Sequence, residues 1–429
     1  MSEFHIQGAA KLSGTFSITG AKNATTPILC AAMLVPGTVV LQNVPDILDV
    51  ARLSTMLRSM GASVTRHGHS LTIKAWDIDP RTLDVKAVKR MRSSSLLISP
   101  LLARFGQLEI PEPGGCNLGK RPFEAHLYAL QAFGVESTIL EEGYRFHAAN
   151  LSPAELTMSE LSPTATENAI VMAALLPGTP TRIHNAASEP HVQDLCHFLE
   201  TAGVNIEGIG THELVIHGVK QLRRDVEYTI IPDPIETGSM ICLAAASHAE
   251  ITLEHAAPLS LMRMEMQKFH ELGVRWEEVP DMDHGWYTSQ HLRILPSKLT
   301  AVYKVHSMPH PGFPSDLLPP FATLATQAEG KTLIHEWMYE DRQKYLGELS
   351  RMGAQIEILD PHRAIITGPT LLTGQSITSF DIRAGATLVI AALIAKGESR
   401  IANIELLDRG YEAFDQRLRA LGAQITRKS

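Results

Sequence analysis

The segments LRSMGASV (residues 57–64) and LRALGAQI (residues 418–425) are two copies of one pattern: a helix end, a glycine and an extended apolar run. Four more copies lie between them, and the six glycines stand 69 to 80 residues apart: Gly61, Gly134, Gly203, Gly273, Gly353 and Gly422. A glycine at this point ends a helix in the left-handed conformation, which other residues adopt only at a cost. Because so even a spacing does not arise by chance, the pattern predicts six repeats of about 70 residues.

Each repeat also contains an apolar helix followed by a turn and a strand, as in residues 23–44 and 383–404. These helices carry small and apolar side chains nearly all round, so they are predicted to be buried, whereas the helices that end at the glycines are charged on one face. Six such repeats, grouped three and three, predict an α/β fold of two similar domains in which short sheets surround buried helices.

The boundary between the two domains is predicted in VKQLRRDVEYTIIPDPIETGSM (residues 219–240), which contains two prolines and a charge cluster. We place one domain at residues 20–231. The other takes residues 232–429 together with residues 1–19, because the first strand is expected to pair with the last repeat. A chain of 429 residues has the length for two hydrophobic cores.

Composition and charge exclude several classes of protein. The net charge is -8, from 38 Lys and Arg against 46 Asp and Glu, and there is no basic tract, so no nucleic-acid partner is expected. The longest apolar stretches, such as residues 241–246, are too short to span a bilayer, so no membrane partner is expected. Residues 1–14 lack a basic run followed by an apolar run, so no signal peptide is expected and the predicted location is the cytoplasm.

No cofactor or metal is predicted either. The 19 histidines are scattered without metal-ligand spacing, and the G-x-G-x-x-G and Walker patterns are absent. The four cysteines have no C-x-x-C spacing, so they are interpreted as free thiols. Cys30, Cys196 and Cys242 lie in apolar helical segments, where cysteine acts as a small core residue.

The fourth cysteine lies in a different setting. Cys116 belongs to EPGGCNLGKRPFEAH (residues 112–126), whose glycines and prolines predict a loop. Lys120 and Arg121 follow closely, and nearby cations lower the pKa of a thiol. The alternative is a buried, inert cysteine, but a polar loop is a poor place to bury one. The sequence therefore predicts a reactive thiol at Cys116.

Several buried helices are predicted to begin beside cations and polar side chains. Lys22 and Asn23 stand at the start of the first, Arg92 at the start of the second, and Asp381 and Arg383 at the start of the sixth. Unpaired amides and the helix dipole favour anions at such positions. Each case alone could be a cap with a solvated charge, but their equivalent places in the repeat favour a shared anion-binding face.

Two further residues, Asp316 and Arg409, can each be interpreted in two ways. Asp316 ends an irregular segment, residues 306–321, just before the fifth buried helix, so it could be an N-cap or a general base. Asp408, Arg409 and Glu412 are expected at the start of the last amphipathic helix. Arg409 could there form a surface ion pair or bind a carboxylate.

Longer motifs run through the whole chain: GAKNA (20–24), PGGC (113–116), PDPIETG (232–238), FPSD (313–316) and DRGYE (408–412). With them the chain resembles, essentially end to end, the UDP-N-acetylglucosamine 1-carboxyvinyltransferases, which are enolpyruvyl transferases related to 5-enolpyruvylshikimate-3-phosphate synthase. The resemblance implies a two-domain inside-out α/β barrel built from six repeats. It also implies transfer of enolpyruvate from phosphoenolpyruvate to the 3′-hydroxyl of UDP-N-acetylglucosamine with release of phosphate, the first committed step of peptidoglycan synthesis.

The resemblance also assigns roles to the matching residues. Phosphoenolpyruvate would be held by Lys22, Arg92, Arg121, Arg383 and Arg409. The nucleotide sugar would contact Asn23, Arg92, Arg121, Pro122, Ser162 and Asp316. The implied catalytic set is Cys116, Asp316, Lys22 and Arg409. In it Asp316 is the base near the 3′-hydroxyl, and Cys116 is the proton donor to the methylene carbon and the residue that fosfomycin alkylates.

The chain departs from the family pattern in the nucleotide region. Glu160 and Thr164 stand where a lysine and a glycine are usual, and Pro234 replaces the arginine of a PDRIETG motif. A carboxylate near a diphosphate weakens its binding. Two alternatives therefore stay open: a paralogue that acts on another nucleotide or nucleoside, and a non-catalytic homologue, against which the retained catalytic set argues. Shikimate 3-phosphate is disfavoured as acceptor, since the cysteine loop and DRGYE belong to the UDP-sugar branch.

Overall fold

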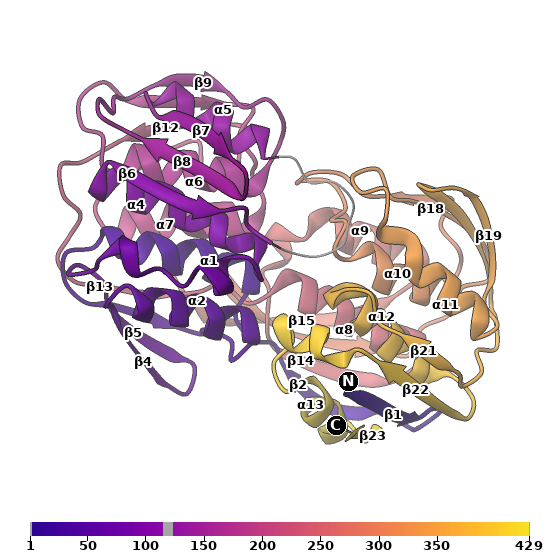
Figure 1. Cartoon of the computed structure of the whole chain (residues 1–429). Coiled ribbons are helices and arrows are strands. Elements are labelled where there is room, and N and C mark those ends of the chain that lie inside the picture. Colours follow the sequence, from indigo (N-terminus) through magenta and orange to yellow (C-terminus); the bar gives the residue numbers. More distant parts are fainter. Residues whose placement is uncertain (1, 115–122, 429) are drawn as a thin grey trace. The chain divides into compact units, whose positions relative to one another are not determined.

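The computed structural model describes residues 2–114 and 123–428 (Figure 1). These residues form two compact units. The first unit comprises residues 20–114 and 123–231, and the second comprises residues 2–19 and 232–428. Both mix helices with short sheets, as the α/β prediction requires, and each is described by itself below.

Three sheets form in the described part of the first unit, with the strand orders β13-β3-β5-β4, β6-β8-β7 and β11-β12-β10-β9. The strands are β3 (Val39–Gln42), β4 (Ser63–His67), β5 (Ser70–Lys74), β6 (Gln107–Pro111), β7 (Glu136–Leu140), β8 (Gly143–His147), β9 (Glu155–Thr157), β10 (Thr181–His184), β11 (Asn205–Glu207), β12 (Glu213–His217) and β13 (Val226–Thr229). The helices are α1 (Lys22–Ala31), α2 (Leu48–Ser59), α3 (Val85–Val88), α4 (Ile98–Phe105), α5 (Glu124–Ala132), α6 (Pro163–Ala174) and α7 (Pro190–Thr201).

The second unit also has three sheets among its described residues, ordered β15-β16-β14-β2, β17-β18-β20-β19 and β21-β22-β1-β23. The strands are β1 (Glu3–Gln7), β2 (Ser13–Ser17), β14 (Glu250–Ala256), β15 (Arg275–Asp283), β16 (Thr288–Leu295), β17 (Lys304–His306), β18 (Gly330–His335), β19 (Gln355–Asp360), β20 (Arg363–Gly368), β21 (Ser376–Thr378), β22 (Glu398–Ala402) and β23 (Gln424–Lys428). The helices are α8 (Pro234–Ala246), α9 (Arg263–Leu272), α10 (Leu318–Ala325), α11 (Tyr345–Arg351), α12 (Ile382–Ile394) and α13 (Phe414–Ala420).

The six repeat glycines all have the left-handed conformation that the sequence predicts, with φ between 90° and 105°. At each one the glycine amide bonds to the carbonyl three residues back, and the next amide bonds to the carbonyl five residues back, as in Gly353 to Ser350 and Ala354 to Leu349. This pair of bonds defines the Schellman motif, and the apolar residues at its two ends pack together. The six motifs end α2, α5, α7, α9, α11 and α13.

The apolar helices are buried, as predicted. Every residue of α8 is buried, and so is every residue of α12 except Ile394. In the second unit α10 contacts both α8 and α12, and the three helices form the centre of its hydrophobic core (Figure 1). The second apolar helix of the chain begins differently from the expectation, as a 3₁₀ helix, η3 (Arg92–Leu97), that continues into α4.

The first strand pairs with the last repeat, which confirms that prediction. β1 lies between β22 and β23 and is antiparallel to both, and Ile6 is opposite Ser399 on one side and Ile425 on the other. β2 then joins the sheet of β14 in parallel. Across residues 2–114 and 123–428, no helix combines the length and the apolar composition that crossing a membrane requires.

Candidate active site

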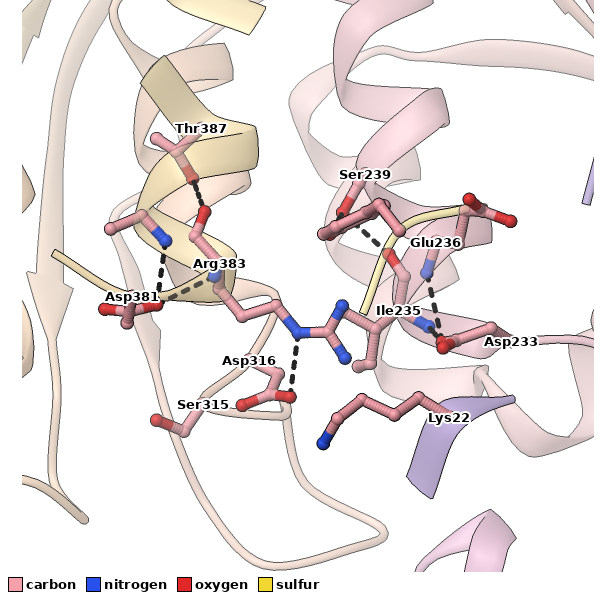
Figure 2. Close-up of polar contacts among 12 residues, drawn as sticks. Lys22, Asp233, Ile235, Glu236, Ser239, Ser315, Asp316, Asp381, Arg383 and Thr387 are labelled. Carbon is pink, nitrogen blue, oxygen red and sulfur yellow. Dashed lines mark hydrogen bonds and ion pairs between the residues drawn. The ribbon is translucent and has the colours of Figure 1, made fainter. Parts of the chain in front are cut away.

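Asp316 is bound by two buried arginines of the second unit. Its Oδ1 accepts a hydrogen bond from Arg342 Nη2 at 2.6 Å. Its Oδ2 accepts one from Arg383 Nε at 3.0 Å, which Figure 2 shows. Arg383 belongs to the first turn of α12 and Arg342 to a 3₁₀ helix, η5 (Arg342–Lys344). The N-cap of α10 is Leu317, so the cap interpretation of Asp316 is wrong and the residue faces cations instead.

The two guanidinium groups set the protonation state of Asp316. Burial by itself raises the pKa of the carboxyl, but the charges and hydrogen bonds of Arg342 and Arg383 outweigh burial and hold that pKa far below its usual range. The side chains of Arg342 and Arg383 are only 3% and 4% exposed, whereas the side chain of Asp316 is 29% exposed. Asp316 is therefore an ionised carboxylate that solvent or a ligand can still reach.

A second set of bonds fixes the FPSD loop that carries Asp316. Ser315 Oγ donates to Glu336 Oε2 at 2.6 Å and accepts from Arg342 Nη1 at 3.1 Å. Ser307 Oγ donates to Glu336 Oε1 at 2.8 Å. Glu336 is 1% exposed, so these bonds lie in the interior, where an unmade bond is costly. The loop, and Asp316 with it, is held in one position.

One hydrogen-bond donor of Arg383 is not used within the described part of the chain. Its guanidinium lies 5.3 Å from the centre of the Tyr411 ring, and its Nη1 is buried without a hydrogen-bond partner in the described part of the chain. Asp381 does not pair with this guanidinium, because it caps α12 by accepting from the backbone amides of Arg383 and Ala384 at 2.7 and 2.9 Å. A buried donor without a protein partner is suited to an anionic ligand.

The PDPIETG segment begins α8 and ties it to the N-terminal strand segment. Asp233 caps the helix by accepting from two backbone amides of its first turn, at 2.7 and 3.1 Å. Pro234 is at the first helical position, where proline is favoured because no amide is needed there. Glu236, 2% exposed, accepts from the Thr19 amide at 2.9 Å and from Arg417 Nη1 at 2.7 Å. Pro234 therefore has a structural role in this chain.

In the first unit, Lys22 begins α1 and Asn23 follows it. The Lys22 Nζ is 3.5 Å from Oδ2 of Asp49, a carboxylate with 0% exposure. Arg52 Nη1 lies 3.6 Å from the other oxygen of Asp49. Because a fully buried carboxylate requires cationic partners, Asp49 holds the Lys22 ammonium in place.

Arg92 begins η3 and lies over an aromatic stack. Its guanidinium carbon is 5.5 Å from the centre of the Phe123 ring. That ring stacks on His126 at 4.5 Å and on Tyr144 at 4.7 Å. Burial and the charge of Arg92 lower the pKa of His126 to about 3, so its imidazole is neutral at neutral pH.

The neutral His126 is connected to Thr164, one of the two departures from the family pattern. Asn168 Oδ1 accepts from the Ser99 amide at 3.1 Å, which makes Asn168 Nδ2 the atom that donates to His126 Nδ1 at 3.2 Å. His126 Nε2 therefore carries the proton and donates to Thr164 Oγ1 at 3.1 Å. A glycine at position 164 could not accept this bond.

Four predicted site residues within residues 20–231 remain: Ser162, Cys116, Arg121 and Pro122. Ser162 directly precedes α6 and donates its amide to the Glu160 carbonyl at 2.8 Å. Glu160 itself is exposed. Cys116, Arg121 and Pro122 lie outside the described residues, so their predicted roles stay predictions.

The expectation for Arg409 needs a correction. Asp408 and Arg409 do not begin the last amphipathic helix, because they end a 3₁₀ helix, η6 (Ile404–Arg409). The α-helix α13 starts only at Phe414, after Ala413 has adopted a left-handed conformation with φ of 40°. Asp408 pairs with Arg427 of β23 at 2.5 Å.

Reasoning from the sequence missed two residues that the structure places beside predicted ones. Arg342 lies 26 positions after Asp316 in a segment without a motif, so no signal could have found it. Asp49 ends NVPDILD (residues 43–49) and lies in the buried first turn of α2, and an aspartate among apolar residues was the signal that could have found it. The three cysteines predicted as core residues are buried, and burial raises the pKa of each thiol.

Metal ligands are not among these side chains: the described residues contain no group of three His, Cys, Asp or Glu that could hold a metal ion. The cations described above are suited to an anion, because guanidinium and ammonium groups donate charge-assisted hydrogen bonds. Each of these cations lies in the first turn of a helix: Lys22 in α1, Arg92 in η3, Arg342 in η5 and Arg383 in α12. Cations at these positions, in a chain of six α/β repeats, are what the resemblance to the enolpyruvyl transferases implies.

Comparison with known proteins supports this class. The family described as EPSP synthase (3-phosphoshikimate 1-carboxyvinyltransferase) matches residues 6–418, and the chain belongs to this family. It is 40% identical to the UDP-N-acetylglucosamine 1-carboxyvinyltransferase of Campylobacter hominis over 100% of both chains. It is 41% identical to the enzyme of that name from Bradyrhizobium diazoefficiens, over 99% of this chain and 98% of the relative.

Solved structures confirm the fold. The enolpyruvyl transferase NikO from Streptomyces tendae aligns with a TM-score of 0.88 at 26% identity, over 100% of this chain and 99% of that one. An EPSP synthase from Acinetobacter baumannii aligns over 100% of both chains with a TM-score of 0.78 at 18% identity, which is a likeness of fold alone. The predicted α/β fold of six repeats is therefore confirmed.

Proposed function

We propose that this protein transfers enolpyruvate from phosphoenolpyruvate to the 3′-hydroxyl of UDP-N-acetylglucosamine and releases phosphate. The observation that carries the proposal is identity of about 40% over the full chain with relatives named for this reaction. The reaction is the first committed step of peptidoglycan synthesis, so the protein would serve cell-wall growth, and with it cell shape and division. The proposal includes a location in the cytoplasm.

We assign the binding of phosphoenolpyruvate to Lys22, Arg92, Arg121, Arg383 and Arg409. A phosphate and a carboxylate together need several cations, and guanidinium groups can bind both in bidentate fashion. Arg383 supports this role, because its buried Nη1 has no partner in the described part of the chain. Lys22 supports it as well. Asp49 is shared between Lys22 and Arg52, and one carboxylate cannot neutralise two cations, so this pairing leaves positive charge for an anion. The nucleotide sugar is assigned to Asn23, Arg92, Arg121, Pro122, Ser162 and Asp316.

Asp316 is the proposed base, and its low pKa determines when it acts. A carboxylate paired with two guanidinium groups takes a proton from a free alcohol only poorly. The proton becomes strongly acidic once the hydroxyl oxygen bonds to the cationic carbon of the protonated enol. Asp316 would therefore accept the proton late, as the tetrahedral ketal forms. In a second step the ketal would lose phosphate and a proton of its methyl group, which re-forms the carbon–carbon double bond.

Cys116 is the proposed acid that protonates the methylene carbon of phosphoenolpyruvate. Protonation creates positive charge on the adjacent carbon, which the acceptor oxygen then attacks. The chemistry needs no cofactor, because the enol phosphate is already activated toward addition and elimination.

A second candidate acceptor, another nucleotide or nucleoside, is favoured by two changes in the nucleotide region. Thr164 binds His126 through a hydrogen bond that a glycine could not form, and Glu160 places a carboxylate two residues before Ser162. These changes concern the nucleotide region and leave Lys22, Asp316, Arg383 and Arg409 in place. They would change which acceptor binds, and would leave the transfer of the enolpyruvyl group unaffected.

Phosphate release from phosphoenolpyruvate tests the proposal. We expect release to require UDP-N-acetylglucosamine, with UMP and shikimate 3-phosphate inactive, and mass spectrometry to detect the enolpyruvyl ether of the sugar. The Asp316→Asn variant, purified in the same way, is the control against contaminating activity. Equal or faster release with UMP or another nucleotide would assign the second candidate, and release with shikimate 3-phosphate would refute both.

A further inference from the structure

The hairpin of the fourth repeat is longer than its counterparts. β15 has nine residues and β16 has eight, whereas the matching hairpin strands β4, β5, β7, β8, β19 and β20 have five or six. This repeat also has the widest glycine spacing, 80 residues from Gly273 to Gly353. The extra residues therefore extend this hairpin, and the reaction proposed above uses none of them.

The extended tip is held firmly by one carboxylate. Asp281 accepts hydrogen bonds from His255 Nδ1 at 2.7 Å and from Ser289 Oγ at 2.9 Å, and its Oδ1 lies 2.9 Å from His291 Nε2. His255 lies at a bulge of β14 and has a left-handed backbone with φ of 52°. A strained residue persists only where its surroundings hold it, so the bond to Asp281 couples the bulge to the tip.

A hollow of about 340 Å³ lies between this tip and the loop at residues 258–260. Glu278 and Gln290 line it from neighbouring strands, and the register, with Pro280 opposite Gln290, puts their side chains on one face of the hairpin. Trp286 and Tyr287 line it from the turn. The volume is in the range of small-ligand pockets, which begin at about 300 Å³.

The charge of the hollow is negative. Within the described part of the chain, Glu278 forms no ion pair, and its contact is with Trp276 Nε1 at 3.4 Å. Its neighbour Glu277 is different, because it pairs with Arg293 at 3.0 Å. No lysine or arginine lines the hollow. His284 stacks on Tyr287 at 4.6 Å, and burial lowers its pKa, so it adds no positive charge at neutral pH.

A carboxylate beside a tryptophan and a tyrosine is the set of groups that attracts an ammonium ion. The face of an aromatic ring is negative, so a cation gains from both the Trp286 ring and the carboxylate, while Tyr287, which is buried, packs against Trp286 at 5.1 Å. An anion, including both substrates of the proposed reaction, would be repelled by Glu278. We propose that the tip of the β15-β16 hairpin is a second binding site, which takes a compact organic cation with an ammonium group.

The test is a saturation-transfer NMR titration of the full chain with choline, at constant ionic strength and about pH 8, where ordinary histidines are neutral. We expect saturable binding of choline and none of 3,3-dimethylbutan-1-ol, its uncharged isostere. Glu278→Gln and Trp286→Leu are each expected to weaken binding at least tenfold, because each removes one of the attracting groups.

Glu277→Gln is the matched control, since it removes an equal charge from the adjacent residue and should leave choline binding unchanged. Phosphate release and thermal unfolding should stay at wild-type values in all three variants, so the test does not depend on the proposed function. Equal binding of the uncharged isostere, equal binding by Glu278→Gln, or no saturable binding at all would overturn the proposal. Preferential saturation by N-acetylglucosamine would assign the hollow to a neutral sugar and would overturn it as well.

Discussion

The protonation of Asp316 depends on two arginines that lie far from it in sequence. Arg383 is 67 positions away and Arg342 is 26 positions away, and both donate to the carboxylate. Because of this pairing, Asp316 stays ionised over the whole range of pH in which enzymes work. A general base usually has a pKa nearer to neutrality, so the arginines hold Asp316 as a weak base for a late proton transfer.

We expect Arg342→Gln to raise the pKa of Asp316, because glutamine keeps a hydrogen-bond donor but removes one counter-charge. An opposite charge at this distance lowers a carboxyl pKa by about 1 to 3 units, so its loss should raise the pKa of Asp316 by about that amount, from far below its usual range toward the ordinary value. Phosphate release measured down to about pH 3 gives the acid limb of the kcat/KM profile, which should lie at higher pH in Arg342→Gln than in the wild type.

Arg363→Gln is the control for this shift, since Arg363 pairs with Asp360 near the β19-β20 turn. Its profile should match that of the wild type. An acid limb that does not move in Arg342→Gln would show that the ionised Asp316 is not the base.

The second prediction for single residues concerns the thiols. We expect fosfomycin to form one covalent adduct, on Cys116, because cations near its loop favour the thiolate. The other three thiols are buried with raised pKa values and should stay unmodified. Cys116→Asp should escape alkylation and keep part of its activity, since a carboxylic acid can also donate a proton.

Intact-mass spectrometry with peptide mapping identifies the site of that adduct. An adduct on Cys30, Cys196 or Cys242 would refute the assignment. Full turnover by Cys116→Ala would do so too, because alanine has no proton to donate.

At the level of helices and strands, the repeat glycines are the clearest link between sequence and structure. All six end a helix with the same two backbone bonds, and each glycine has a positive φ. The conformation is local, since it depends on the absence of a Cβ and on an apolar contact across the motif. For this reason the six helix ends could be predicted without any tertiary information.

Helix α11 offers a matched pair of glycines to test this argument. Gly353→Ala, at φ of 103°, should destabilise the protein by about 1 to 2 kcal/mol, the cost of a left-handed residue with a Cβ. Gly347→Ala, inside the helix with no atom near the added Cβ, should stabilise it by about 0.5 to 1 kcal/mol. Urea unfolding followed by circular dichroism measures both. Equal shifts of the same sign would contradict the argument.

Other element boundaries could not be predicted in this way. The last amphipathic helix was expected to begin near Asp408, but it begins at Phe414. The acidic residues around Arg409 look like a helix start in sequence, whereas the chain first forms η6 and then turns at Ala413. Non-local packing determines that turn, since alanine has no intrinsic preference for a left-handed conformation.

For the molecule as a whole, the pH dependence of stability comes from carboxyls that folding buries. Asp194, on α7 in the first unit, is the clearest case. Burial raises its pKa to about 7, although Tyr228 donates a hydrogen bond to it at 2.6 Å. Asp194 also accepts from the Ile231 amide at 3.3 Å, at the last residue of that unit.

The sign of the effect follows from the raised pKa. Below the pKa of the unfolded chain, about 3.9, both states are protonated and the contribution to stability is fully present. As the pH rises toward 7, the folded state keeps a proton that the unfolded state has lost, and stability falls by up to about 4 kcal/mol. Asp194→Asn should remove this fall, which flattens the dependence of the melting temperature on pH between about 4 and 7.

Tyr228→Phe is the companion variant for Asp194. It removes the hydrogen bond that lowers the pKa of Asp194, so the fall in stability should extend to higher pH. Differential scanning calorimetry across the pH range measures both variants. A wild-type slope in Asp194→Asn would show that another group causes the pH dependence.

The sequence by itself determined the number of repeats, the six glycine-closed helix ends, the buried helices and the pairing of the first strand with the last repeat. These features depend on short-range patterns, namely the period of apolar residues and the conformational freedom of glycine. Only the tertiary structure decided that Asp316 lies between Arg342 and Arg383, that Lys22 pairs with Asp49, and that Thr164 binds His126. Such contacts join residues that are 26 to 67 positions apart, so they depend on how the repeats pack, and no local pattern encodes them.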